Sequence, residues 1–256
     1  MMPSQRQKQI MDLIAVKKAV TVEQLCGKMY ASPATIRRDL TALEGRGLIQ
    51  RTHGGAVLLE GAGDEQSILA RQEKNAEAKK KIGELAACFI KDSSTVMMDP
   101  SSTVCSVVPF LTRHRRLSVV TNGLNCALAL SRQTSAGVYL PSGKLNVRSN
   151  ALVGSGTIRD IAGYYADVCL LSCAGLSPEF GVTEPSVEQA GIKTAMMGQA
   201  KTRILLADGS KFGQRFLAKV CGLEQFDYVI TDRRPDPELE TYFSTIGCDL
   251  VYPEQT

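Results

Sequence analysis

A chain of 256 residues is long for one small domain, so it forms either one large α/β domain or a small domain joined to a medium-sized one. With 44% hydrophobic and 22% charged residues, the composition is that of a folded globular protein and excludes disordered and collagen-like chains. Because no apolar run reaches the roughly 18 residues of a membrane-spanning helix and the N-terminus has no signal-peptide pattern, we expect a cytoplasmic protein with no membrane partner.

The cysteines and histidines do not have the spacing of a metal site. Eight cysteines form no CxxC pair, and the two closest, Cys169 and Cys173, have three residues between them. Most of them lie in apolar surroundings typical of buried thiols in a reducing compartment. We therefore expect no disulfide, no metal and no cofactor.

The net positive charge is confined to the N-terminal quarter. Residues 1–60 contain nine of the 30 Lys and Arg residues and five of the 26 Asp and Glu residues, which leaves 21 of each sign in the rest of the chain. The whole excess of +4 thus lies in the first sixty residues, as expected if this part contacts a polyanion. An ordinary charged surface would explain the same number, so the residue pattern must decide.

Three helices are predicted in this quarter. Capping-box motifs at residues 4–7 and 21–24 each precede apolar residues at helical spacing. Ser32 and Pro33 begin a third helix as its N-cap and first helical residue, and Gly45 ends it. Two short helices joined by a tight turn form a helix-turn-helix, whose second helix enters the major groove of DNA.

The third helix has an apolar stripe and a polar face. Ile36, Leu40 and Leu43 form the stripe, while Asp39 is expected to orient a neighbouring Arg instead of contacting DNA. The residues off the stripe with DNA-binding chemistry are Thr35, Arg37, Arg38 and Thr41. Arg pairs bidentately with guanine, and Thr contacts phosphate or a thymine methyl group. A solvated basic face would explain the charges, but not the helix caps around them.

A β-hairpin is predicted directly after this helix. In LIQRTHGGAVLL, residues 48–59, two apolar-rich arms enclose a polar turn, which is typical of the wing of a winged helix-turn-helix. Arg51 and His53 are the candidates for phosphate contact. His53 is explained nearly as well as a surface turn residue.

The N-terminal segment resembles a known family. SPATIRRDLTALEGRGLIQRTHGGA, residues 32–56, closely resembles the DNA-binding signature of the DeoR family of bacterial transcriptional regulators. In that family the helix that carries TIRRDL is the recognition helix. The resemblance therefore places these residues in the DNA-reading element: Ser32, Thr35, Ile36, Arg37 and Arg38.

The remainder of the chain has the pattern of an α/β domain. Small polar residues at 60–64 predict a linker, and 67–90 is expected to be helical. Seven short apolar segments then alternate with helical ones, starting at residues 95, 117, 137, 168, 203, 228 and 248. This alternation predicts a mostly parallel sheet covered on both faces. We therefore expect a winged helix-turn-helix domain over residues 1–60, a linker over 61–73 and a larger α/β sensor domain over 74–256.

Ligands of such sheets bind at the carboxyl ends of the strands, so the loops there hold the candidate effector residues. Hydroxyl groups after the first strand could hold a phosphate, Lys144 and Lys211 could neutralise it, and Asp99 and Asp208 could accept sugar hydroxyls. Taken singly, each of these residues is better explained as a loop or helix-cap residue. The candidates are Asp99, Ser101, Ser102, Thr103, Asn122, Gly143, Lys144, Asp208 and Lys211.

A looser resemblance to the DeoR family covers residues 74–232. It is carried, in order, by KKKIGELAACFI, MMDPSST, VVTNGL, LPSGKL, LLADGSKF and VITD. It implies a sensor domain related in fold to ribose-5-phosphate isomerase, with a phosphorylated sugar or related metabolite as ligand. Two loops depart from the family pattern, because Pro100 to Thr103 replace a Gly-Thr-Thr type loop and Ser142-Gly143 replace a Gly-Gly.

The leading hypothesis is a transcriptional regulator, a repressor of a carbohydrate-use operon that leaves its double-stranded DNA operator when a sugar phosphate binds. A dimer or tetramer is expected, since one helix-turn-helix covers only a short site. The first alternative is a sugar-phosphate isomerase or deaminase, for which Glu184 and Glu188 are the nearest acid-base candidates; a loop residue and a first-turn helix acid explain them more simply. The second is a regulator that responds to a protein partner. We expect no enzyme activity.

Overall fold

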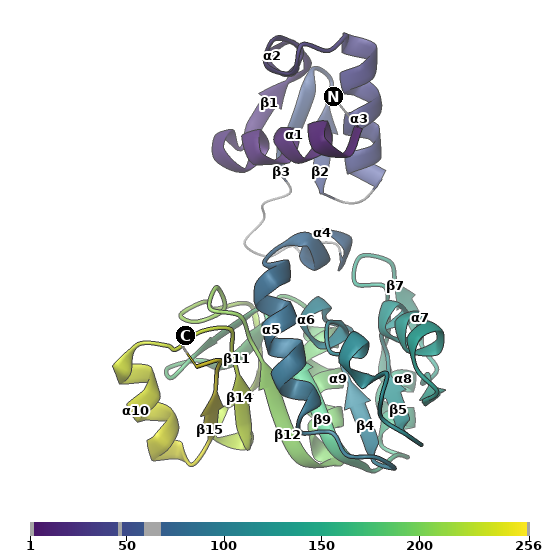
Figure 1. Cartoon of the computed structure of the whole chain (residues 1–256), viewed down its shortest axis with the longest axis vertical. Coiled ribbons are helices and arrows are strands. Elements are labelled where there is room, and N and C mark those ends of the chain that lie inside the picture. The colour runs from purple at the N-terminus through teal and green to yellow at the C-terminus, as the bar shows by residue number, and fades with distance from the viewer. Residues whose placement is uncertain (1–2, 46–47, 59–67, 255–256) are drawn as a thin grey trace. The chain divides into compact units, whose positions relative to one another are not determined.

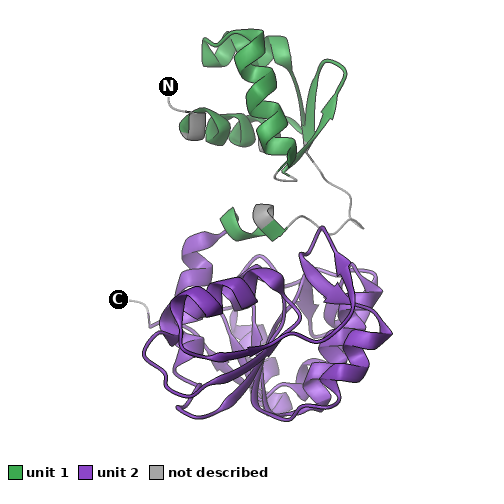
Figure 2. Cartoon of the chain, turned by 90° about the vertical axis from the view of Figure 1, so that its right-hand side faces the viewer, with its two compact units in different colours: residues 1–74 green, residues 75–256 purple. Residues whose placement is uncertain are grey.

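A computed structural model describes residues 3–45, 48–58 and 68–254 and divides the chain into two compact units, residues 1–74 and 75–256 (Figure 2). Within the described residues, no helix has the length and apolar character to cross a membrane. Of the predicted linker, residues 61–73, the structure describes only residues 68–73.

The N-terminal unit contains a winged helix (Figure 1). Its elements are α1 (Pro3–Lys17), β1 (Ala19–Thr21), α2 (Val22–Met29), α3 (Pro33–Gly45), β2 (Ile49–Thr52) and β3 (Gly55–Leu58). The strands form an antiparallel sheet in the order β1-β3-β2, and β2 and β3 are the two arms of the predicted hairpin. The predicted helix-turn-helix and wing are both confirmed.

Two of the three predicted helix starts are confirmed. The Thr21 hydroxyl accepts the Gln24 N–H at 3.1 Å while the Gln24 side chain accepts the Thr21 N–H, which is a complete capping box. The Ser32 hydroxyl accepts the Thr35 N–H at 3.3 Å at the start of α3. The expectation for Ser4 was wrong: α1 begins at Pro3, since proline is well suited to a first turn where its missing N–H is not needed.

One apolar core holds these elements together. Its buried residues come from the three helices and from all three strands, and include Ile10, Leu25, Ile36 and Leu40. The wing lies directly against β1, because a Cβ atom added at Gly55 would be 2.0 Å from the Val20 carbonyl oxygen. Only glycine allows that approach.

The larger unit is built on a seven-stranded sheet in which every neighbouring pair is parallel (Figure 1). The strands are β4 (Thr95–Met98), β5 (Ser118–Thr121), β6 (Gly137–Tyr139), β9 (Ala166–Ser172), β12 (Ala200–Leu206), β14 (Tyr228–Ile230) and β15 (Asp249–Val251). All seven coincide with the predicted apolar segments. Their order is β15-β14-β12-β9-β4-β5-β6, so the chain reverses its direction of progress across the sheet between β4 and β9.

Two buried clusters cover the two faces of this sheet. Alternate residues point to opposite faces: Val96 and Met98 belong to one cluster, whereas Met97 belongs to the other. The helices are α5 (Ala76–Ala87), α6 (Ser102–Cys105), α7 (Leu124–Gln133), α8 (Ser155–Ile161), α9 (Val187–Gly198) and α10 (Pro237–Ile246), with 3-10 turns at Val108–Leu111 and Leu223–Gln225. Residues of α5, α6 and α7 lie in the first cluster, and those of α8, α9 and α10 in the second.

Among the described residues of the larger unit, five short strands were not predicted. β7 (Lys144–Asn146) and β8 (Ala151–Val153) form a hairpin, and β10 (Gly175–Ser177), β11 (Gly181–Glu184) and β13 (Ala218–Cys221) form a small antiparallel sheet. They are three or four residues long, which is too short for an alternating pattern to stand out.

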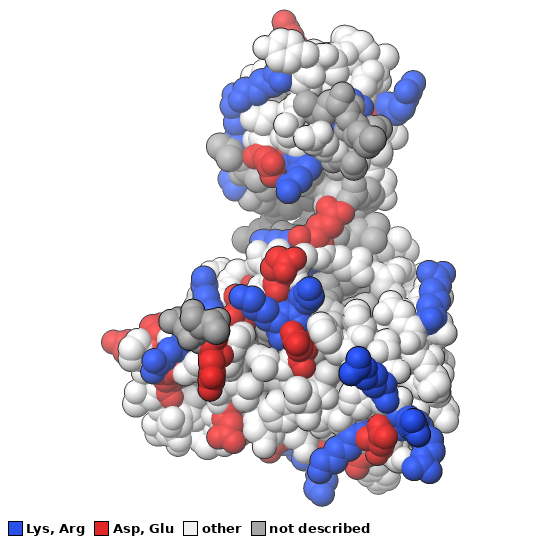
Figure 3. Space-filling model, in the orientation of Figure 1, with Lys and Arg blue, Asp and Glu red and all other residues white. Residues whose placement is uncertain are grey.

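The predicted helix over residues 67–90 is two helices, α4 (Ile68–Glu73) and α5. Asn75 breaks them apart with a left-handed backbone (φ 55°, ψ 37°), a conformation that asparagine tolerates better than most residues. On the face of the larger unit seen in Figure 3, Lys and Arg lie among Asp and Glu, in keeping with its balanced charge.

Candidate functional site

The exposed face of α3 carries most of the predicted DNA contacts. Arg37, Arg38 and Thr41 are exposed, and they lie on the side of the helix opposite Ile36 and Leu40, which are 0% and 1% exposed. Thr35, half-buried, and Ser32, exposed, form the first turn, where their hydroxyl oxygens are 3.0 Å apart.

One residue of the predicted reading set does not belong to this surface. Ile36 has no exposed area and packs in the core of the unit, so its side chain cannot contact DNA in this fold. The resemblance placed it in the reading helix, and its role there is to pack the helix against the core of the unit.

Asp39 fixes α3 onto α1. Its carboxylate is buried and forms an ion pair with Arg6, and it also accepts a hydrogen bond from the Gln7 side chain at 3.2 Å. The expected neighbouring arginine is thus Arg6 of α1, which the sequence around Asp39 did not indicate. Because both partners are on α1, this cluster sets the orientation of the helix that carries Arg37 and Arg38.

The wing is tied to the same helix. The Arg51 guanidinium donates to the Thr41 hydroxyl at 2.9 Å, and the Arg51 N–H donates to the Glu44 carboxylate at 3.0 Å. His53 is exposed in the turn of the hairpin. Arg51 is therefore held beside the exposed face of α3, with its charge available at the surface.

In the larger unit, the predicted loops lie at the carboxyl edge of the sheet, and the switch point between β4 and β9 is where a ligand of such a sheet usually binds. Asp99 follows β4 there and has no exposed area. Its carboxylate accepts the N–H groups of Ser101 and Ser172, both at 2.8 Å, and forms an ion pair with Lys193. Both carboxylate oxygens therefore already accept hydrogen bonds, so the role of Asp99 is to hold the surrounding loops in place.

Lys193 was missed by sequence reasoning. It lies on the buried face of α9, is 2% exposed, and its ammonium group contacts Asp99, the Ser172 carbonyl at 2.7 Å and the Glu184 carboxylate at 3.2 Å. Burial alone would lower the pKa of Lys193, but Asp99 and Glu184 raise it well above the usual value. A signal was present, because Lys193 interrupts the apolar stripe formed by Ala190, Met196 and Met197.

Charged groups act on the thiol of Cys173, which directly follows β9. Burial and the Glu184 carboxylate raise the pKa of the Cys173 thiol. The charges of Lys211 and Lys193 act on the pKa of the same thiol in the opposite direction. Lys211 is only half-buried, and its carbonyl accepts the N–H of Leu176 in β10 at 3.0 Å. This hydrogen bond places the backbone of Lys211 beside β10.

The loop after β4, which carries three hydroxyl groups, is buried, and one of these hydroxyl groups already caps a helix. Ser101, Ser102 and Thr103 are 7%, 7% and 3% exposed. The Ser101 hydroxyl caps α6 by accepting the Val104 N–H at 3.1 Å, so it has a structural role there. Pro100 lies against Gly123, where an added Cβ atom would be 2.7 Å from the Pro100 Cα atom. This contact joins the loops that follow β4 and β5.

Two buried amides near this loop have an unused acceptor. Asn122 donates to the Leu152 carbonyl at 2.9 Å and Gln189 donates to the Ser149 hydroxyl at 3.1 Å. Neither side-chain oxygen has a hydrogen-bond partner among the residues that the structure describes. Buried acceptors are normally satisfied, so these two are suited to hydroxyl or amino donors of a ligand or water.

The predicted effector residues come from loops that follow different strands of the sheet. Gly143 and Lys144 follow β6, which is four strand positions from β12, the strand that precedes Asp208 and Lys211. Gly143 has a packing role, since an added Cβ atom would be 2.1 Å from the Thr157 hydroxyl oxygen. By contrast, β4 and β12 are two positions apart, about 10 Å.

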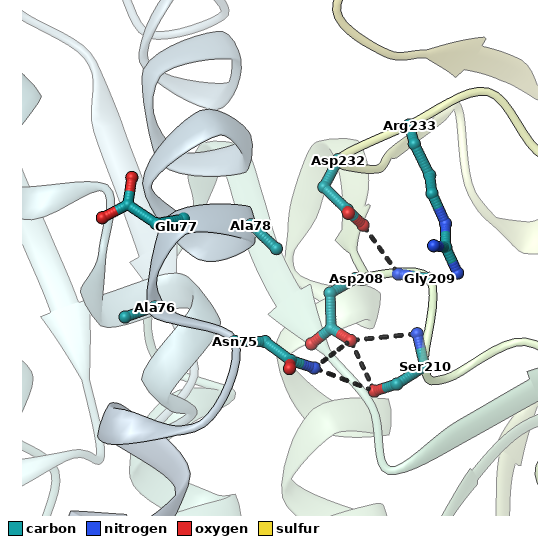
Figure 4. A pocket seen from close by; sticks show the side chains of 9 residues that line it. All are labelled: Asn75, Ala76, Glu77, Ala78, Asp208, Gly209, Ser210, Asp232 and Arg233. Carbon is teal, nitrogen blue, oxygen red and sulfur yellow. Dashed lines mark hydrogen bonds between the residues drawn. The ribbon is translucent and has the colours of Figure 1, made fainter.

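A hollow of about 410 Å³ opens beside the loop that follows β12 (Figure 4). The Asp208 carboxylate accepts hydrogen bonds from the Asn75 amide at 3.0 Å and from the Ser210 N–H at 3.0 Å. Burial alone would raise the pKa of Asp208, but the Ser210 hydrogen bonds, with the charge of Lys211, lower it. Asp208 is thus an ionised anchor for the first turn of α5. The hollow is lined by residues 75–78, 208–210, Asp232 and Arg233.

Metal-binding groups were not found. Within the described part of the chain, no three His, Cys, Asp or Glu side chains gather so that they could hold a metal ion. All eight cysteines are free thiols, five of them buried.

A winged helix joined to an α/β unit with a polar carboxyl edge defines the class of ligand-responsive DNA-binding regulators. Two family models match the chain: the DeoR-like helix-turn-helix domain over residues 6–61 and the DeoR C terminal sensor domain over residues 74–233. The chain belongs to the DeoR family of transcriptional regulators, as the sequence resemblance implied.

Full-length relatives support the same assignment. The chain is 36% identical to the HTH-type transcriptional repressor GlcR of Bacillus subtilis (strain 168), with 96% of this chain and 95% of the relative covered. It is 30% identical to the Glycerol-3-phosphate regulon repressor of Escherichia coli (strain K12), with 92% and 93% covered. Among solved structures, a D-ribose-5-phosphate isomerase in complex with phospho-erythronic acid matches with a TM-score of 0.41 and 14% identity over 54% of each chain, a likeness too low to bear on function.

Proposed function

We propose that this chain is a repressor of a carbohydrate-use operon that binds its double-stranded operator through α3 and the wing, and that a phosphorylated sugar bound at the carboxyl edge of the sensor sheet releases it. The observation that carries the proposal is the combination of an exposed Arg37, Arg38 and Thr41 face with an ionic cluster at the switch point of the larger unit. Release follows if the sugar phosphate prefers a conformation or assembly that no longer fits the operator.

The DNA contacts divide into two kinds. Arg38 is exposed on the groove-facing side of α3, where a guanidinium can pair with guanine, so it supplies base preference. Arg51 is held at the wing by Thr41, where it supplies charge to phosphates. A homodimer or tetramer would place two such units on half-sites about 34 Å apart, or a multiple of that.

The DNA assignment is tested by two substitutions. Arg38→Ala should weaken binding to a duplex selected by the wild-type chain by about 1 to 3 kcal/mol and relax base preference, whereas Arg51→Ala should weaken all duplexes and reduce the salt slope by about one. Lys8→Ala removes an exposed charge from α1 and serves as the control. Unchanged affinity and preference in Arg38→Ala would refute the recognition-helix assignment.

Two observations support a phosphorylated effector. Lys211 is a half-buried lysine in the loop that follows β12, and the unpartnered Asn122 and Gln189 oxygens can accept hydroxyl hydrogens. The name of one relative, a Glycerol-3-phosphate regulon repressor, supports a phosphorylated metabolite. We place the sugar phosphate between the loops after β4 and β12 and leave Gly143 and Lys144 out of the site.

A thermal-shift screen against phosphorylated sugars and their unphosphorylated parents tests this half of the proposal, because a ligand of the native state raises the melting temperature. A hit limited to a phosphorylated sugar should also release DNA. Lys211→Ala should abolish that release and keep DNA affinity, while Lys201→Ala, at the other end of β12, should respond normally. If no sugar phosphate shifts a sample that binds DNA, a protein partner becomes the better hypothesis.

The enzyme alternative has one specific observation in its favour, the buried Asp99–Lys193–Glu184 cluster. Acid-base catalysis needs a group that exchanges protons near neutral pH. Lys193 has a raised pKa and Asp99 has both oxygens hydrogen-bonded, so the cluster is a closed ionic network. Turnover of sugar phosphates by the purified chain would overturn this judgement.

A further inference from the structure

Tyr30 is an exposed aromatic residue in the turn of the helix-turn-helix. It directly follows α2, and Ser32 and Pro33 begin α3 two residues later. Its side chain is 97% exposed, more than any other exposed large hydrophobic residue of the described chain. Burial in the free protein therefore gives no reason for a tyrosine at this position.

The backbone of Tyr30 makes the residue more unusual. Its φ and ψ are 49° and 43°, and its N–H donates to the Cys26 carbonyl to close α2. This left-handed position at a helix end is normally occupied by glycine or asparagine, because a side chain with a Cβ atom is strained there. Tyr30 is the one aromatic residue among the described non-glycine residues with positive φ.

A residue that is strained, and whose side chain is exposed in the free protein, is expected to make a stabilising contact in a bound state. The two helices of a helix-turn-helix dock with one across the DNA backbone and the other in the groove, so the turn between them lies near the phosphates. A phenol suits that place, since its O–H donates to a phosphate oxygen and its ring packs against deoxyribose.

We propose that Tyr30 is a DNA-backbone contact, which clamps the phosphodiester strand beside the groove that α3 enters. The proposal rests on the proposed DNA-binding function and adds a contact outside the set of DNA-binding residues predicted from the sequence. The proposal predicts that replacing Tyr30 with glycine lowers the affinity for DNA and raises the local stability of the helix-turn-helix.

The test uses the full-length chain and a duplex selected from a random pool by the wild-type protein. Tyr30→Gly removes the side chain and the strain, so the dissociation constant should rise about tenfold while the α2 and α3 amides exchange hydrogen about fivefold more slowly. Tyr30→Phe should lose a smaller part of the affinity and keep wild-type exchange, since it retains the strain and the ring. Ser93→Gly relieves a left-handed residue of the larger unit and should leave DNA affinity unchanged.

Arg38→Ala, measured in the same assay, distinguishes a failure of the Tyr30 proposal from a failure of the proposed DNA-binding function. If Arg38→Ala weakens binding while Tyr30→Gly and Tyr30→Phe bind as tightly as the wild type, the Tyr30 proposal is wrong and the DNA-binding function stands. If the wild-type chain selects no duplex, the proposed function fails and takes the Tyr30 contact with it. A loss of affinity in Tyr30→Gly together with faster exchange of α2 and α3 would show damage to the fold and would also overturn the proposal.

Discussion

Replacing Lys193 with methionine removes the one cation of the buried switch-point cluster. Methionine has a similar length, so the space within α9 stays filled while the charge is lost. Asp99 then keeps only the two N–H groups that donate to it at 2.8 Å, and Glu184 loses the ammonium group at 3.2 Å. Two carboxylates with 0% and 8% exposure would lie side by side without a counter-charge.

Breaking a buried ion pair by removing one partner costs about 3 to 5 kcal/mol, since the other charge stays buried. We expect the upper part of this range because two carboxylates lose the same partner. For a unit of this size, each kcal/mol lowers the melting temperature by about 2 to 4 °C. The larger unit of Lys193→Met should therefore melt about 8 to 20 °C below that of the wild type.

Calorimetry of the full-length chain measures this shift. Lys201→Met, which removes an exposed lysine from β12, is the matched control and should change melting little. The double variant Asp99→Asn with Lys193→Met should lose less stability than the sum of the two single variants. A Lys193→Met protein that melts with the wild type, or a strictly additive double variant, would refute the assignment of this cluster as a coupled ion network.

Three other results are expected. Gly55→Ala should destabilise the N-terminal unit by about 1 to 3 kcal/mol, because the added methyl group would meet a β1 carbonyl oxygen at 2.0 Å; an unchanged melting curve would contradict that approach. Asp39→Ala should lower the free energy of unfolding of the N-terminal unit by about 3 kcal/mol, because it removes the carboxylate that pairs with Arg6. Amide hydrogens of α3 should then exchange faster, and unchanged exchange rates would show that this ion pair does not stabilise α3. Because Ser210 helps to hold the pKa of Asp208 low, the ionised form stabilises the larger unit above the unfolded pKa of about 3.9, and this contribution is lost as the pH falls through the lower folded value. In urea titrations Asp208→Asn should show a smaller loss of stability below pH of about 4 than the wild type, and identical acid profiles would contradict the shift.

The sequence predicted the framework well because the framework depends on local patterns. Most strands of the parallel sheet are short apolar runs that are largely buried, although the edge strands β6 and β15 are only partly so, and such a run is visible without its neighbours. The recognition helix was equally visible, since its cap at Ser32 and its buried residues Ile36 and Leu40 lie within nine residues.

The candidate site was harder to predict because it depends on strand order. The polar loops were expected at the carboxyl edge of the sheet and lie there, but the strand order places Gly143 and Lys211 after strands that are four positions apart. Lys193 finds Asp99 across 94 positions of sequence, a pairing that no local pattern reveals. Asn75 breaks a predicted helix without a glycine or proline to announce it, and its amide partner Asp208 is 133 positions away.

The reversal of strand order between β4 and β9 has a consequence for biosynthesis. The buried residues of the N-terminal core, which lie between positions 10 and 56, pack against one another, so this core can form soon after it leaves the ribosome. β4 must wait for β9, which emerges about seventy residues later and supplies the centre of the sheet. During synthesis the winged helix therefore precedes the sensor domain, and a chain interrupted before residue 166 would carry a complete winged helix without the central strands of the parallel sheet.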